Sequence, residues 1–147
     1  MNAAHGKVVY QFLLDRGIAK KSGETTPSNP WIITWGNEPK DGLKTNTVTD
    51  TGADQDGRAM DDGERTEYPT AMLTFRSNDY AAAVAKMQAV ERLFDTKSGF
   101  YRASVTVDGE ACILHAVHVR TKWTKIGKTE QDLDLFTMNV QITAESA

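Results

Sequence analysis

The sequence predicts a single α+β domain over residues 1–147, with a mostly antiparallel sheet of about five strands and two main helices packed on one face. Two observations predict this class. Apolar residues recur at helical spacing in two segments of the chain. In four other segments they alternate along the chain, as they do in strands, and a fifth, at 110–120, is apolar on both faces, as in a central strand. Three of these five segments follow one another with turn residues between them.

Both predicted helices have an apolar stripe and a plausible boundary. The first, over residues 4–16, ends before Gly17 and has on one face Val8, Val9, Phe12 and Leu13. The second, over residues 79–95, has a longer stripe consisting of Tyr80, Ala83, Val84, Met87, Val90 and Phe94. Either Ser77 or Asn78 is expected to cap its first turn, because both side chains can accept a bond from a free backbone amide.

The strands are predicted from alternation and from residue types that favour extended backbone. They are expected at residues 31–36, 68–76, 101–107, 110–120 and 135–142. Asp108 and Gly109 form a hairpin turn in this interpretation, and a second turn lies around Gly127. Trp31 and Trp35 are expected on the core face of their strand, because side chains two residues apart share a face.

Residues 37–66 are predicted to be a long acidic loop insertion. Apolar residues are sparse there, glycines recur, and eight acidic residues stand against four basic ones. Such a segment buries too little apolar surface to offset the entropy of ordering it. Long loops in small domains are usually functional or disordered, so we expect this one to become ordered when a partner covers it.

Composition excludes several classes of function. The net charge is −3, which disfavours nonspecific binding of nucleic acid. The only cysteine, Cys112, lies in an apolar run and is expected to be a small core residue, so no disulfide within the chain is possible. The amino terminus lacks the apolar segment of a signal peptide, and no stretch is long enough to span a membrane.

No catalytic, cofactor-binding or metal site is predicted. His115 and His118 are three residues apart on one strand and therefore point to opposite faces. The motif Asp54-Gln55-Asp56-Gly57 resembles part of a calcium loop, but glycine stands where an EF-hand needs its first aspartate and its final glutamate. No sequence motif of a catalytic nucleophile or of a phosphate-binding loop is present.

One aromatic residue is a candidate contact with a protein partner. Trp123 follows Arg120 and Lys122 and can be exposed at a strand end, where aromatic residues often anchor interfaces. Packing into the core is the other interpretation of Trp123, and the sequence leaves both open.

The order of these elements resembles the tail terminator (tail completion, lambda U-like) family of long-tailed bacteriophages. The matching segments are YQFLLDRGIA at 10–19, IITWGNEP at 32–39, AMLTFRSNDYAAAVAKMQAVERLF at 71–94 and WTKIGKTEQDLDLFTMNVQIT at 123–143. No single motif carries the resemblance, which lies in the order and spacing of elements over most of residues 8–144. The insertion at 37–66 is longer than a plain strand connection and departs from compact members.

The resemblance implies a structural virion protein that assembles in the host cytoplasm. Such a protein forms a ring, usually hexameric, that caps the tail tube, stops its polymerisation and joins the tail to neck proteins of the filled head. Genomic DNA passes through the lumen, which is commonly acidic, without specific binding. The residues that we expect at an interface or the lumen are Asp50, Asp54, Asp56, Asp61, Asp62, Glu64, Arg120, Lys122 and Trp123.

Two other functions remain open at this stage. The first is another neck or head-closure protein of the same virion, which sequence separates poorly from a terminator. The second belongs to a different class: a small enzyme with a cryptic site, built around His115 or His118. The family has no catalytic residues to transfer to this chain, and it implies no cofactor.

Overall fold

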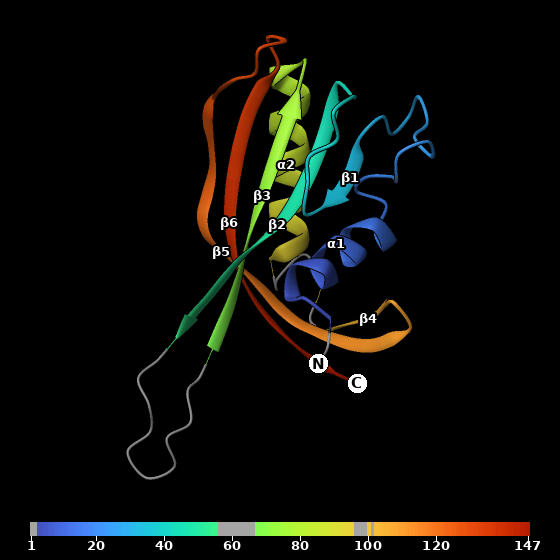
Figure 1. Ribbon diagram of the computed structural model, residues 1–147, viewed down its shortest axis with the longest axis vertical. Coiled ribbons are helices and arrows are strands. Elements are labelled where there is room, and N and C mark those ends of the chain that lie inside the picture. Colours follow the sequence, from blue (N-terminus) through green and yellow to red (C-terminus); the bar gives the residue numbers. More distant parts are fainter. Residues whose placement is uncertain (1–2, 56–66, 96–99, 101) are drawn as a thin grey trace.

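The computed structural model describes residues 3–55, 67–95, 100 and 102–147, and it has two helices and six strands in these ranges (Figure 1). In chain order the elements are α1 (His5–Asp15), β1 (Ile32–Trp35), β2 (Lys44–Gln55), β3 (Glu67–Ser77), α2 (Tyr80–Phe94), β4 (Ala103–Val107), β5 (Glu110–Lys128) and β6 (Asp134–Ser146). The α+β class and both predicted helices are confirmed.

The sheet is mixed and has six strands in the order β1-β2-β3-β6-β5-β4. Only β1 and β2 run parallel, and the other neighbouring strands are antiparallel. The parallel pair arises because the connection at 36–43 returns along the outer face of the sheet before β2 begins. Arg76 holds this connection in place by donating from Nη2 to the carbonyls of Pro39, at 2.8 Å, and Gly42, at 3.3 Å.

The sixth strand, β2, lies inside the segment predicted to be a loop, so that prediction is wrong for residues 44–55. Val48 faces the core, while Thr45 and Thr47 on the opposite face are buried. A threonine-rich strand has few apolar residues, yet its β-branched side chains suit extended backbone. Neighbouring strands on both sides supply the backbone hydrogen bonds that a loop would lack. The predicted loop residues 56–66 lie outside the described residues.

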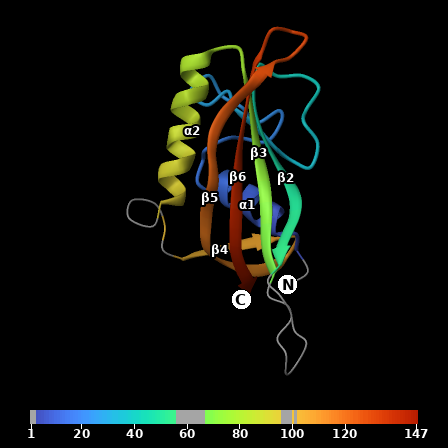
Figure 2. The same cartoon turned by 90° about the vertical axis from the view of Figure 1, so that its left-hand side faces the viewer.

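One face of the sheet carries the core, and both helices pack against it. Phe75 pairs with Phe136, Leu73 with Met138 and Ala71 with Val140 in the register of β3 and β6, and all six side chains are buried. The sheet curls around α1, which contacts every strand, while α2 covers β3 and β5 (Figure 2). The rings of Phe12 and Phe94 stack at 6.4 Å and join the two helices.

Three local predictions need correction. The N-cap of α2 is Asp79, whose carboxylate accepts from two amides of the first turn; Ser77 instead bonds to the backbone of Asp79. β5 continues through Gly127 to Lys128, and the turn that follows is closed by the amide of Thr129, which donates to the carbonyl of Leu133. Trp35 lies on the predicted face, where its indole bonds to Asp50 beside α1, but it is 40% exposed at the margin of the core and not packed into it.

The predicted hairpin turn is confirmed. Asp108 and Gly109 have φ angles of 50° and 81°, the left-handed pair that a tight two-residue turn requires. In the described parts of the chain, no helix is long and apolar enough to cross a membrane.

Candidate interaction surface

Asp50, predicted at an interface or lumen, is bonded inside the molecule. Its Oδ1 accepts from the backbone amide of Gly6 at 2.7 Å, and its Oδ2 accepts from the indole Nε1 of Trp35 at 2.8 Å. The first bond satisfies an amide in the opening turn of α1, which has no side-chain cap of its own. A negative charge at a helix N-terminus is also favourable. The carboxylate of Asp50 therefore ties β2 and β1 to α1.

Other charges meet at the same end of α1. Lys7 donates from Nζ to Asp108 at 2.6 Å and lies 5.1 Å from the centre of the Trp35 ring. We call the group Gly6, Lys7, Trp35, Asp50 and Asp108 the α1 anchor. The charged side chains of the α1 anchor contact one another, Trp35 or the backbone of the same chain. The structure therefore gives Asp50 a role inside the fold, where the sequence had suggested an external contact.

The outer side of β5 is different, because most of this strand has a partner on one side only. β4 pairs with β5 over Glu110–Leu114, and beyond that point β6 is the one described strand that pairs with it. We call Thr121–Lys128 the β5 edge. All but one of its residues are exposed, and its charged residues are Lys122, Lys125 and Lys128. Lys125 pairs with Asp134 at 3.1 Å and Lys128 with Asp132 at 3.3 Å in the same chain. An exposed strand edge offers backbone groups to another chain.

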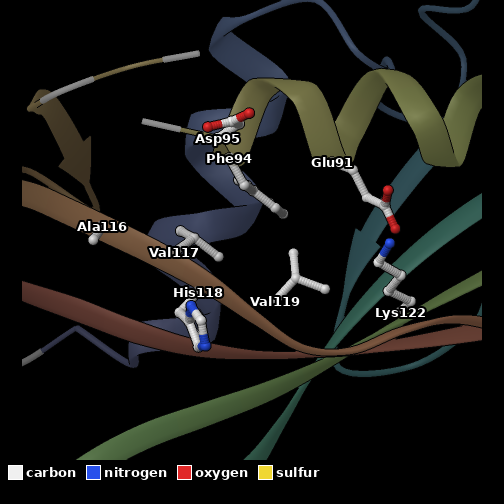
Figure 3. Close-up of a pocket in the computed structure, with 8 residues that line it drawn as sticks. All are labelled: Glu91, Phe94, Asp95, Ala116, Val117, His118, Val119 and Lys122. Carbon is white, nitrogen blue, oxygen red and sulfur yellow. The ribbon is translucent and has the colours of Figure 1, made fainter. Parts of the chain in front are cut away.

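A groove of about 370 Å³ lies between α2 and β5, next to this edge (Figure 3). Its lining residues are Glu91, Phe94, Asp95, Ala116, Val117, His118, Val119 and Lys122. Phe94 and Val117 give it an apolar floor. The side chains of Glu91 and Lys122 point toward each other across it (Figure 3). Glu91 Oε1 is buried without a hydrogen-bond partner among the described groups.

Arg120 and Lys122 do not come together. The pairing of β5 with β6 shifts register between Val119 and Thr121, and a second time before Thr124. Lys122 lines the α2–β5 groove, whereas Arg120 lines a separate hollow of about 300 Å³ on the outer face of the sheet, with Thr51 and Thr70. β-bulges redirect side chains in this way, so spacing in the sequence did not place these two cations.

Trp123 lies within β5, not at its end, and it is half-buried. Its ring meets that of Phe136 edge-on at 6.2 Å, and Tyr80 packs against Phe136 at 5.6 Å. The interpretation of Trp123 as a packed residue is therefore the better one. The exposed apolar residue of this edge is its neighbour Ile126, which is 56% exposed.

The remaining predicted acidic residues contribute no described side-chain contacts. Asp54 lies near the end of β2, paired in register with Tyr68, and its side chain is outside what the structure describes. Asp56, Asp61, Asp62 and Glu64 lie outside the described residues altogether.

The two histidines do not form a site. His115 is hydrogen-bonded to Glu145 at 3.0 Å, while His118 lines the α2–β5 groove. Within the described ranges no group of three or more histidine, cysteine, aspartate or glutamate side chains is placed to hold a metal ion. Burial, and to a lesser extent the charge of Glu110, raises the pKa of Cys112, so its thiol stays protonated and unreactive at neutral pH.

Sequence reasoning missed Glu91, although a signal for it was present. Glu91 follows Met87 by four residues and precedes Phe94 by three, so it belongs near the apolar stripe of α2. It also missed the β5 edge, because nothing local shows where β4 stops pairing. No protein-family model matches this chain, and no curated protein matches its sequence.

Proposed function

We propose that this chain is a structural, ring-forming protein, the tail terminator of a long-tailed bacteriophage. In this role the ring caps the tail tube, stops its polymerisation and joins it to a neck protein of the filled head. The observation that carries the proposal is the β5 edge, an exposed stretch of strand with a described partner on one side only. A long unpaired edge in a small protein favours association with another chain.

The chemistry of this edge favours a head-to-tail ring over a two-fold dimer. A two-fold contact through the edge would bring Lys122 of one copy against the edge lysines of a second copy. It would also have to accommodate, in each copy, the ion pairs of Lys125 with Asp134 and of Lys128 with Asp132. Like charges placed opposite each other destabilise strand pairing. A different, acidic surface of the next copy avoids this repulsion. Contacts between unlike surfaces generate rings when the rotation between copies closes.

The outer face of the sheet supports the second part of the role, the passage of DNA. Side chains there are mainly uncharged and polar, and those that the register assigns to this face in β2, β3 and β6 include Thr47, Thr49, Thr70, Thr74, Thr137, Asn139 and Gln141. Thr51 joins them through its hydrogen bond to Thr70. A duplex held by few cations slides past a surface instead of adhering to it. A net charge of −3 acts in the same direction.

The mass of the purified protein in solution, with and without tail tubes, tests this proposal. We expect rings, visible by electron microscopy, and tubes whose growth stops where a ring is attached. A strict monomer that leaves tube length unchanged would overturn the terminator role. Rings that ignore tubes but join filled heads would identify another neck protein of the virion. Tight, salt-sensitive binding of duplex DNA at about 50 mM salt would instead indicate a nucleic-acid binder.

A further inference from the structure

The α2–β5 groove contains two opposite charges that face each other without forming an ion pair in the part of the chain that the structure describes. Glu91 lies on α2 and Lys122 on β5, and their side chains point toward each other across the groove (Figure 3). Glu91 Oε1 is buried and has no hydrogen-bond donor among the described groups. Lys122 Nζ likewise has no acceptor among them. Because an unpaired buried acceptor is unfavourable, a ligand that brings a donor to Glu91 gains affinity.

The floor of the groove is apolar. Phe94 of α2 and Val117 of β5 form it, and each is 4% exposed. The half-buried side chain of Val119 extends this floor toward the two charges. The volume of about 370 Å³ lies within the range of small ligand sites. The groove therefore suits an occupant that combines an apolar group with a short polar group.

The polar group of the occupant has to serve both walls of the groove. A cation would pair with Glu91 but be repelled by Lys122, and an anion would meet the opposite combination. A trans peptide group is uncharged, and its N–H and C=O point in opposite directions. It can therefore donate to the carboxylate of Glu91 and accept from the ammonium of Lys122 at the same time. Both bonds have a charged partner, which makes them stronger than bonds between neutral groups.

The strand beside the groove favours an extended peptide as the source of this group. β4 pairs with β5 only as far as Leu114, and over Ala116–Val119 β6 is the one described strand that pairs with it. The other side of this stretch has backbone groups that a peptide laid along it can use. Peptides that bind strand edges gain affinity from main-chain hydrogen bonds and specificity from pockets for alternate side chains.

We propose that the α2–β5 groove is a binding site for an extended peptide segment of a partner protein. One peptide group of this segment lies between Glu91 and Lys122, and an adjacent apolar side chain packs on Phe94 and Val117. The site goes beyond the proposed function and does not depend on it, because the groove is complete within one copy of this chain.

Acetyl-phenylalanine N-methylamide is the probe, because it carries one apolar side chain between two peptide groups. Saturation-transfer NMR with the purified full chain measures its binding, and we expect a Kd of about 1 mM, which is usual for a fragment of this size. Lys122→Met and Glu91→Met should each raise the Kd at least about fivefold, because each removes one hydrogen bond to a charged group. The matched control is Lys21→Met, which removes an exposed lysine away from the groove and should leave the Kd unchanged. Urea unfolding checks that each variant is folded.

Two related molecules show which feature of the probe is recognised. Acetyl-alanine N-methylamide lacks the apolar ring, and free phenylalanine has an ammonium and a carboxylate in place of the peptide groups. Both should bind at least about fivefold more weakly than the probe. Absence of saturable binding, equal binding of the alanine compound, or a Kd that neither variant changes would overturn the peptide site. Tighter binding of free phenylalanine would also overturn it and would indicate an amino-acid site. None of these results bears on ring formation, which the mass in solution tests separately.

Discussion

The α1 anchor and the β5 edge are both rich in charge, but they use it in different ways. In the anchor, the carboxylate of Asp50 accepts two hydrogen bonds from groups on other elements. On the edge, Lys122 lies at the mouth of a groove and Ile126 is exposed to solvent. The anchor joins parts of one chain. On the edge, Lys125 and Lys128 also pair within the chain, with Asp134 and Asp132, but the exposed strand and Ile126 suit contact with another chain.

This difference shows that residue type alone does not tell whether a charged side chain on a strand stabilises the fold or contacts another chain. Asp50 was predicted to be an external contact because it belongs to an acidic segment of sequence. It serves the fold instead, because α1 begins beside it and lacks a cap of its own. Replacing residues in the two regions should therefore affect different properties: stability for the anchor and assembly for the edge.

The largest effect is expected for Asp50→Ala. It leaves the amide of Gly6 and the indole N–H of Trp35 without their charged acceptor, and hydrogen bonds to charged groups contribute about 1.5–3 kcal/mol each. Because the bond to Trp35 is exposed to solvent and contributes less than the bond to Gly6, we expect the free energy of unfolding in urea to fall by about 2–4 kcal/mol. Thr51→Ala, next in sequence on the exposed surface, is the control and should change stability by less than about 1 kcal/mol. Equal losses in both variants would remove the distinction between the two regions.

Gly6→Ala should destabilise the protein, although alanine is normally about 1 kcal/mol better than glycine within a helix. A Cβ at this position would lie 2.5 Å from Asp50 Oδ1, so the carboxylate must move and lose its bond. In the Asp50→Ala background the same substitution should become neutral or stabilising. Urea unfolding of the four proteins in this double-mutant cycle measures the coupling. A cost of Gly6→Ala that is identical in both backgrounds would contradict the close contact.

Lys86 of α2 gives a smaller effect on stability, which depends on pH. Its Nζ donates to the carbonyl of Ile18 at 2.7 Å, and burial lowers its pKa from the ordinary value of 10.5. The unfolded chain then binds more protons than the folded one between the lowered pKa and 10.5, so this group makes stability rise with pH in that window. Lys86→Met should flatten the rise in unfolding experiments, whereas the exposed Lys21→Met should not. If the free energy of unfolding changed with pH in the same way in Lys86→Met and Lys21→Met, the lowered pKa of Lys86 would be refuted.

The smallest effect on stability is expected for Ile126→Ser, because its side chain is mostly in water. We expect the free energy of unfolding to change by less than about 0.5 kcal/mol. Self-association should weaken about tenfold, which corresponds to about 1.4 kcal/mol of lost contact between copies. Sedimentation velocity measures the association, and Leu43→Ser is the control of similar exposure. If Ile126→Ser lowered the free energy of unfolding but left self-association unchanged, the assignment of Ile126 to a contact between copies would be wrong.

Periodic burial was predictable from the sequence, and the reason is local. The helix at Tyr80–Phe94 and the alternating strand that carries Phe136 each repeat their apolar residues at the period of the element. The Asp108-Gly109 turn was equally predictable, because only certain residues accept a positive φ. β2 was not, because burial of its outer threonines depends on the sheet and on the connection at 36–43, which Arg76 of the distant strand β3 holds in place.

The candidate surface was predictable only in part. The basic residues of β5 are evident in the sequence, but the sequence placed the end of that strand near residue 120 and a turn at Gly127. A glycine is compatible with a turn and with an irregular strand alike, and here β6 pairs with the chain on both sides of it. The separation of Arg120 from Lys122 follows from register shifts that have no signature in residue type.

The sequence by itself determined which segments are helices, most of the strands, and the apolar faces, since these depend on neighbours a few residues away. The tertiary structure alone decided that Asp50 serves the fold, that β2 is a strand, and that β5 keeps an exposed edge. Each of these depends on a partner that is distant along the chain, such as Gly6, 44 residues before Asp50. Backbone and side-chain hydrogen bonds form wherever folding brings a donor and an acceptor together. The residues around each group therefore do not show which distant group will be its partner.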